Sequence, residues 1–189
     1  LINCDGGEIT LDNRDLTILP MYKRAKLGLG FLPQQPSIFR GMSVEDNLLA
    51  ILETKHYQKD QKQNILEELL TEFSLSHIRR AMPHMLSGGE RRRTEIARCL
   101  CSDPSIILMD EPTAGVDPIG IDDIKNLIRQ LMNKNIGVLI TDHNVREVLD
   151  ICDYSYVMHA GAIIAEGDSD KIIGNTEARK FYLGDSFKY

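Results

Sequence analysis

Two acidic residues stand directly behind a run of four apolar side chains. The run Ile106 to Met109 has no polar side chain, and Asp110 and Glu111 follow it before Pro112. Such a run is typical of a strand at the centre of a parallel sheet, buried on both faces. Adjacent carboxylates at the end of a strand point to different sides, so one can hold Mg²⁺ while the other activates a water molecule. The simpler alternative is a strand that ends in an ordinary polar turn.

A second candidate site is a glycine pair at the start of a predicted helix. Ser87 and Glu90 have the spacing of a capping box, so we expect a helix to begin here. Gly88 and Gly89 each weaken that helix by about 1 kcal/mol relative to alanine. In exchange, bare glycines let an anion approach the N–H groups at the positive end of the helix dipole. An ordinary capped helix stays open as the alternative, and we expect two of the three arginines at 91–93 on a solvated face.

Two further polar residues follow predicted strands. His143 comes after the strand 137–141, at the position that the acid pair has on its own strand. An imidazole there is suited to sense the terminal phosphate of a nucleotide, although a lone histidine is more often structural. Gln34 follows the strand 29–32 and Pro33, and its carbonyl oxygen can reach a metal ion or a water. Ligands of open α/β sheets bind at the carboxyl ends of the strands, where these residues are expected.

Helices and strands alternate after Ser87, which predicts right-handed βαβ crossovers and a parallel sheet. The section before Ser87 is expected to be helical, starting with a capping box of Ser43 and Asp46. The expected elements are a strand at 8–11, a polar turn at 12–15, a helix at 20–27, a strand at 29–32, helices after 43 and at 59–73, a helix at 88–101, a strand at 106–109, a helix around 121–131, a buried strand at 137–141, a helix around 145–149, a β-hairpin of 154–158 and 162–165, and a helical tail.

The charge and the hydropathy pattern exclude some classes of partner. The 189 residues carry 22 Lys and Arg against 28 Asp and Glu, a net charge of -6. A chain that mainly grips phosphodiester backbones is normally basic, so we expect no nucleic-acid partner. The longest stretch without a charge, 27–39, contains two prolines and two glutamines and is shorter than the ~20 apolar residues of a membrane span. We therefore expect no direct membrane span.

Taken together, the four candidate sites resemble the ATPase subunit of an ABC transporter, in the same order and at similar separations over essentially the whole chain. Residues 32–34 resemble the Q-loop, 86–90 the signature motif, 106–111 the Walker B strand with its catalytic glutamate, 114–117 the D-loop and His143 the switch histidine. The resemblance implies a P-loop NTPase-like (RecA-like) α/β fold. Its parallel sheet would be flanked by helices, with an inserted helical subdomain, a C-terminal β-hairpin and a helical tail.

Finer matches resemble the bacterial lipopolysaccharide-export ATPase family, with branched-chain amino-acid importer ATPases as the nearest alternative. These matches lie at 32–39, 87–98, 114–118, 141–147 and 182–187. The resemblance also implies a division of the chain. The remainder of an N-terminal nucleotide-binding lobe would span 1–35, a helical subdomain 36–85, the signature helix and catalytic core 86–167, and a C-terminal helical tail 168–189.

The same resemblance implies a role for each candidate residue and a set of partners. ATP and Mg²⁺ would be the cofactors, and a second copy of the chain would complete each site in a head-to-tail dimer. Transmembrane permease subunits, contacted by Phe39, would place the chain at the cytoplasmic face of the inner membrane. The implied roles are ATP binding for Ser87, Gly88, Gly89, Glu90, Gln34 and Asp117, Mg²⁺ binding for Asp110 and Gln34, general-base catalysis for Glu111, and alignment of the γ-phosphate with that base for His143.

One part of the family pattern has no match. The phosphate-binding loop G-x-x-x-x-G-K-[ST] does not occur in the sequence. In the family that loop precedes the segment that residues 1–9 resemble, so we expect the N-terminal part with the loop to be missing. The function implied is ATP hydrolysis that powers export of lipopolysaccharide or another lipid-like substrate, and a non-catalytic regulatory or truncated subunit stays open beside it. DNA-maintenance ATPases share the motifs but need long heptad segments or basic surfaces. A chain of 189 residues with a net charge of -6 supplies neither.

Overall fold

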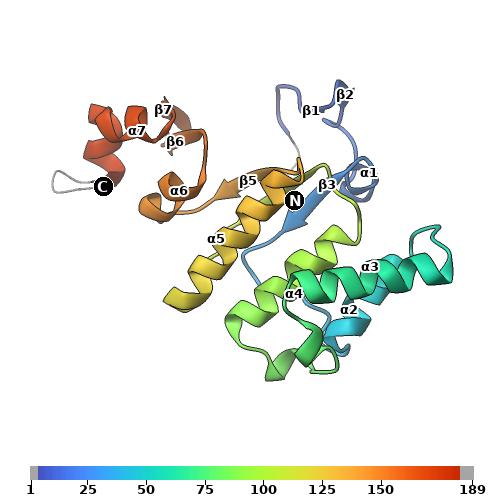
Figure 1. The fold of residues 1–189 in the computed structure, drawn as a ribbon. Coiled ribbons are helices and arrows are strands. Elements are labelled where there is room, and N and C mark those ends of the chain that lie inside the picture. The colour runs from blue at the N-terminus through green and yellow to red at the C-terminus, as the bar shows by residue number, and fades with distance from the viewer. Residues whose placement is uncertain (1–3, 184–189) are drawn as a thin grey trace. The chain divides into compact units, whose positions relative to one another are not determined.

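The computed structural model describes residues 4–183 of the chain (Figure 1). The expected motif at 182–187 and the expected tail at 168–189 therefore lie outside the described residues from position 184 onward. The chain divides into two compact units, residues 1–139 and residues 140–189.

The first unit opens with a small antiparallel pair, β1 (Thr10–Leu11) and β2 (Arg14–Asp15). Asp12 and Asn13 form the turn between them with φ of 49° and 62°. The expected strand at 8–11 is therefore shorter than predicted, and the expected polar turn at 12–15 is wrong in its second half. Asp and Asn tolerate left-handed backbone well, so two residues suffice to reverse the chain and the next two already pair.

A three-stranded sheet carries the unit, with the order β3-β4-β5. β3 (Leu29–Leu32) runs parallel to β4 (Ile106–Asp110), and the register pairs Leu29 with Ile106 and Leu32 with Met109. β4 is thus the central strand, as its apolar run predicts. The short helix α1 (Met21–Lys26) precedes β3, and Gly28, at φ 98°, makes the connection. A Cβ at Gly28 would lie 2.7 Å from Ser105 Oγ, so this position requires glycine.

The third strand, β5 (Gly137–Thr141), has the expected bounds but not the expected burial. Leu139 in its middle is 52% exposed, so the prediction of a strand buried on both faces is wrong. β5 follows β4 at the end of the strand order and has no described strand on its other side. A short apolar run indicates a strand but does not show how many of its faces other elements cover.

Four further helices of this unit lie at the predicted positions. They are α2 (Val44–Leu52), α3 (Lys59–Glu72), α4 (Gly88–Leu100) and α5 (Pro118–Asn133). α4 packs on β3 and against α2 and α5, while α3 packs on α2. Short 3₁₀ turns, Ser76–Ile78 and Pro83–Met85, lead from α3 to α4. The buried side chains of α3 and its C-cap are Leu66, Leu69, Leu70 and Phe73, and those of α2 include Leu48 and Leu52.

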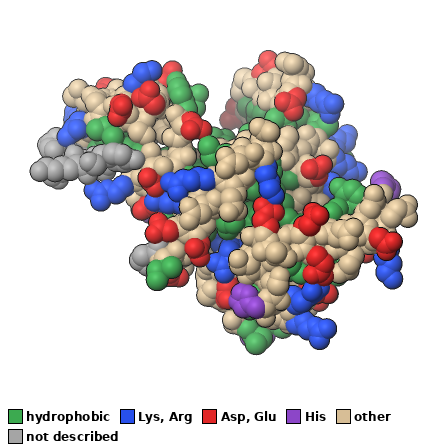
Figure 2. Space-filling model, viewed as in Figure 1, with side chains coloured by type: hydrophobic (Ala, Val, Ile, Leu, Met, Phe, Trp, Pro, Cys, Tyr) green, Lys and Arg blue, Asp and Glu red, His purple; other side chains and the backbone are tan. Residues whose placement is uncertain are grey.

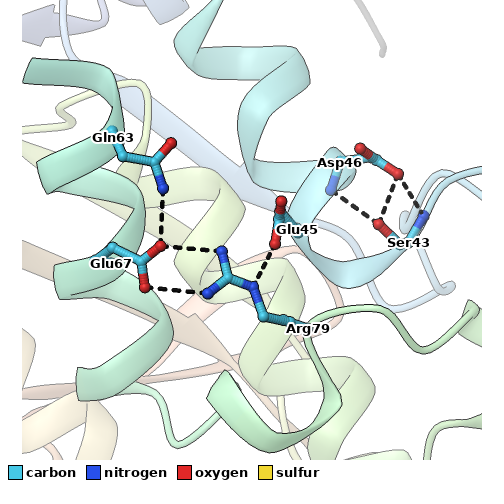
Figure 3. A network of polar contacts seen from close by, with 6 residues as sticks. All are labelled: Ser43, Glu45, Asp46, Gln63, Glu67 and Arg79. Carbon is cyan, nitrogen blue, oxygen red and sulfur yellow. Dashed lines mark hydrogen bonds and ion pairs between the residues drawn. The ribbon is translucent and has the colours of Figure 1, made fainter. Parts of the chain in front are cut away.

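A polar network joins the segment before α4 to α2 and α3 (Figure 3). Arg79 donates to the Glu45 carboxylate of α2, and its Nη1 and Nη2 donate to Glu67 of α3 at 3.2 and 2.9 Å. The two Glu67 contacts form the bidentate geometry that favours arginine over lysine. Beside this network, Ser43 and Asp46 form the predicted capping box of α2. The three segments are therefore held together by contacts from one guanidinium.

The second unit has a small core of its own. The helix α6 (Val145–Ile151) is followed by the antiparallel hairpin β6 (Ser155–His159) and β7 (Ala162–Gly167). α7 (Ser169–Gly174), α8 (Thr176–Ala178) and a π-helical turn (Arg179–Leu183) complete it. The predicted hairpin and helical tail are confirmed up to position 183. The core residues are Leu149, Ala165, Ile172, Ala178 and Leu183.

The surface carries charges of both signs. Figure 2 shows acidic and basic side chains interspersed over the face in view, without one extended basic area. In the described part of the chain, no helix has the length and apolar character needed to cross a membrane.

Candidate functional site

The structure brings Gln34 and Glu111 into direct contact, although 77 positions separate them in the sequence. Gln34 follows β3 and Glu111 follows β4, and the two strands are parallel neighbours. The Gln34 amide Nε2 donates to the Glu111 carboxylate Oε2 at 2.7 Å. An amide that donates through nitrogen keeps its carbonyl oxygen as an acceptor, so the same side chain can also serve a metal ion.

The acid pair itself is split by a change of backbone conformation. Asp110 is the last residue of β4, whereas Glu111 has φ 42°, in the left-handed region. A non-glycine residue in such a conformation costs of order 1–3 kcal/mol and is concentrated at functional sites. Both side chains are half-buried. Asp110 therefore belongs to the strand and Glu111 to the turn after it, and the separate tasks of the two carboxylates stay a prediction.

The second candidate site has the capping geometry that its sequence predicts. The Ser87 backbone N–H donates to the Glu90 carboxylate at 2.8 Å, and the Glu90 N–H donates to Ser87 Oγ at 3.2 Å. Ser87 and Gly88 are exposed, while Gly89 is buried. Because the Ser87 hydroxyl accepts this bond, its proton remains a donor for an anion at the helix start.

Residues of the expected D-loop lie beside this glycine pair. A Cβ added to Gly88 would be 3.0 Å from the Gly115 carbonyl oxygen, so Gly88 allows a close approach between the two segments. Asp117 accepts a hydrogen bond from the Gly120 N–H at 3.0 Å and caps α5. The capping role was not predicted, although Asp followed by Pro at the first helical position is its usual signal.

The arginines after Glu90 do not form the solvated face that was expected for two of them. Arg92 is buried, and Arg91 and Arg93 are half-buried. Arg91 donates to the Leu86 carbonyl, and Arg93 pairs with Asp123 at 3.2 Å. A charged run in a sequence usually marks a solvent-facing surface, but here α4 is packed on several sides, and Arg92 and Arg93 each have a carboxylate partner.

Glu95 is a buried acid that the sequence reasoning missed. Its side chain is 3% exposed and lies 3.2 Å from Arg92 Nη1. The pair has the i, i+3 spacing of neighbours on a helix, which is the only signal for it in the sequence. Nothing local in the sequence predicts that the other Glu95 oxygen binds the backbone of residues 37 and 38.

Phe39 is 41% exposed and is held by polar neighbours. The Arg98 guanidinium lies 4.3 Å from the centre of the Phe39 ring, a cation–π distance. The Asn47 side chain accepts from the Phe39 N–H at 2.8 Å and donates to its carbonyl at 3.2 Å. Leu48 of the adjacent helix α2 is fully buried in the core, so it is not exposed as Phe39 is.

His143 belongs to the second unit, where it is exposed and its Nδ1 lies 3.8 Å from Asp142 Oδ1. Its place beside the acid pair stays a prediction. Among the residues that the structure describes, no three His, Cys, Asp or Glu side chains gather as a metal site. Mg²⁺ commonly takes only one or two protein carboxylates together with substrate phosphates and water.

Ser87→Ala should lower the stability of the first unit, because it removes the side-chain acceptor at the N-cap of α4. The expected loss is about 1 kcal/mol, which lowers the unfolding midpoint by about 2–4 °C for a chain of this size. Thermal unfolding followed by circular dichroism measures it. Ser76→Ala, at an exposed position, is the control. Equal midpoints for Ser87→Ala and the control would contradict the capping role.

The capping box should also make stability depend on pH. The Ser87 backbone N–H, together with its hydroxyl, lowers the pKa of Glu90 below its ordinary value of 4.5. Its stabilising effect is therefore complete above pH 4.5 and is lost as the pH falls through the lowered pKa. From neutral to acid pH, the midpoint of the parent should fall further than that of Glu90→Gln. Parallel pH profiles for the two would show that this carboxylate does not stabilise the fold.

The sheet, the acid pair after its central strand and the helix that Ser87 caps ahead of two glycines are features of one class of protein. The family model "ABC transporter" matches residues 1–114, more than half of the chain. The chain therefore belongs to the ABC transporter ATP-binding family, and the predicted P-loop NTPase-like fold is confirmed.

Two relatives by sequence and one solved structure show how similar this chain is to individual members of the family. An uncharacterised ABC transporter ATP-binding protein of Rhizobium meliloti is 51% identical over 187 residues, which cover 99% of this chain and 69% of the relative. The lipopolysaccharide export system ATP-binding protein LptB of Haemophilus influenzae is 49% identical over 189 residues, covering 100% of this chain and 78% of that protein. A solved ATP-binding cassette of an ABC transporter in its ADP conformation superposes with a TM-score of 0.83 at 29% identity, covering 97% of this chain and 79% of that structure.

Proposed function

We propose that this chain is the ATP-hydrolysing subunit of an ABC transporter that exports lipopolysaccharide or another lipid-like substrate. The observation that carries the proposal is the 2.7 Å contact between Gln34 and Glu111 at the ends of two parallel strands. It joins the Q-loop residue to the acid behind the Walker B strand. The identity to relatives named for lipopolysaccharide export supports the choice of substrate.

In this proposal the residues at the sheet edge divide the work of hydrolysis. Glu111 accepts the proton of the attacking water, and Gln34 holds its carboxylate in place. Asp110 and the Gln34 carbonyl oxygen are the hard oxygen ligands that suit Mg²⁺. When bound, Mg²⁺ would neutralise negative charge on the phosphates. His143 would align the γ-phosphate with Glu111.

The signature residues would serve the nucleotide of a second copy. Ser87 and Gly88 are exposed at the start of α4, where backbone N–H groups and the helix dipole favour an anion. Glu90 fixes Ser87 through the capping box, and Asp117 lies in the neighbouring segment. We propose that these residues close on the γ-phosphate of ATP held by the other subunit, which makes hydrolysis depend on a head-to-tail dimer.

Transmembrane permease subunits would be the other partners, with Phe39 as an exposed contact. This places the chain at the cytoplasmic face of the inner membrane. The test is to reconstitute the full-length subunit with its permease subunits in proteoliposomes and to measure ATP hydrolysis and the release of lipopolysaccharide. Uptake of branched-chain amino acids instead would assign it to an importer. A complex that binds the permease without hydrolysing ATP would identify a non-catalytic subunit.

A further inference from the structure

One face of α4 binds the loop that connects β3 to α2. Arg92, Glu95 and Arg98 follow one another at three-residue intervals and all contact residues 33–39. Arg92 Nη1 donates to the Pro33 carbonyl at 3.2 Å. Arg98 donates to the Ser37 carbonyl and hydroxyl at 2.9 Å each. The loop is therefore held along its length by a helix that is distant from it in the sequence.

Glu95 makes the contacts at the centre of this face. Its Oε1 accepts the Ser37 N–H at 2.6 Å and the Ile38 N–H at 3.1 Å, and its Oε2 accepts from Arg92. Arg92 Nε and Nη2 have no hydrogen-bond partner among the described residues, so Glu95 is the only described carboxylate paired with this guanidinium. A buried charge pair is often no more stabilising than apolar side chains of similar size. What a carboxylate adds here is a fixed position for two backbone N–H groups.

The loop that Glu95 holds has a functional candidate at each end. Gln34 lies near its start and binds Glu111 at 2.7 Å. Phe39 is the last of the loop residues that α4 contacts, and it is half-exposed and covered on one side by Arg98. α4 itself begins at the capped glycine pair. α4 thus connects three places: its own start, where we propose that a phosphate binds, the amide beside the acid pair, and the exposed aromatic ring.

We infer that Glu95 is a positioning residue that fixes residues 33–39 to α4, so that Gln34 and Phe39 move together with the signature end of the helix. The inference rests on the proposed function, because it assigns Glu95 a part in coupling ATP hydrolysis to the membrane partner. Glu95 itself does not touch the nucleotide or the membrane partner in this proposal, and its effect on both passes through the positions of Gln34 and Phe39.

The test combines hydrogen exchange with turnover, using the full-length subunit and its permease complex. Glu95→Ala removes the acceptor, Glu95→Gln keeps one carbonyl oxygen, and Glu53→Gln is the matched control at a surface position. In Glu95→Ala we expect faster exchange of the Ser37 and Ile38 amides, with the amides of α4 unchanged. Turnover of the complex should fall about 10–100-fold, as for a displaced catalytic group, while the ATP dissociation constant changes less than about twofold. Glu95→Gln should be intermediate, and Glu53→Gln unchanged.

A purely structural role of Glu95 predicts a different result. The unfolding midpoint of the variant would be lower, but its turnover at temperatures below that midpoint would be normal. Faster exchange at 37 and 38 with parental turnover would overturn the inference. If Glu95→Ala fails to fold, Glu95→Gln decides, and parental exchange and turnover in that variant would also overturn it. Failure of the proposed function gives another pattern. In that case the parent complex does not hydrolyse ATP, while the exchange of the two amides still shows whether Glu95 holds the loop.

Discussion

Glu111→Gln should lower the ATP turnover of the full-length subunit by about 10²–10⁴-fold, the usual contribution of a positioned general base. An amide cannot accept the proton of the attacking water, but it has the size and shape of the carboxylate. The contact with Gln34 therefore remains possible in the variant. ATP should still bind, and the closed dimer should accumulate. Single-turnover assays measure the loss of hydrolysis, and an equilibrium measurement of nucleotide affinity shows whether ATP still binds.

The control for this variant is Glu53→Gln, which makes the same chemical change at an exposed residue that caps the C-terminus of α2. It should hydrolyse ATP at the parental rate. If Glu111→Gln also retained near-parental turnover, Glu111 would not be the base, and another group would have to activate the water.

Gly88→Asp should abolish the use of the signature motif, and its Cβ, like that of Gly88→Asn, would also crowd the Gly115 carbonyl oxygen at 3.0 Å. An acidic residue in the first turn of a helix is favourable for the helix, but its carboxylate would stand where the γ-phosphate is proposed to bind. We expect turnover of the variant to fall by about 10²-fold or more, the size of effect seen when an anion-stabilising donor is lost. Gly88→Asn has nearly the same shape without the charge, so the difference between the two variants isolates the repulsion.

Mixed dimers of Gly88→Asp and Glu111→Gln subunits give a sharper result. In a head-to-tail dimer, one nucleotide site would carry both defects and the other would have an intact base and an intact signature. The mixed dimer should therefore hydrolyse ATP much faster than either variant alone. If the mixed dimer were as inactive as the dimers of each single variant, each subunit would complete its own site.

Features set by local chemistry could be predicted from the sequence. The capping boxes at Ser43 and Ser87 were recognised because their partners stand three residues away and the geometry is the same wherever a helix begins. β4 was recognised because four apolar residues bounded by a turn and by acids fit a central strand. Gln34 and Glu111 were both expected at the carboxyl ends of strands, whereas the hydrogen bond between them was not predicted.

Features that depend on tertiary packing could not be predicted. β5 has an apolar run like that of β4, yet Leu139 is half-exposed, since the sequence does not show what covers each face. Arg92 and Glu95 look like surface charges on a helix but are buried against a loop about 60 residues earlier. The left-handed conformation of Glu111 has no signal in residue type, because glycine or asparagine is usual there.

Our central proposal is that Asp110, Glu111 and His143 would together bind one Mg²⁺-bound triphosphate. A structure of the full-length complex with Mg²⁺ and a non-hydrolysable ATP analogue tests it most directly. The account predicts Asp110 on the metal, directly or through one water, and Glu111 and His143 within about 2.6–3.2 Å of the attacking water or the γ-phosphate, or one water away. A γ-phosphate bound with His143 turned away from it, or with Glu111 out of reach of any water, would contradict the account.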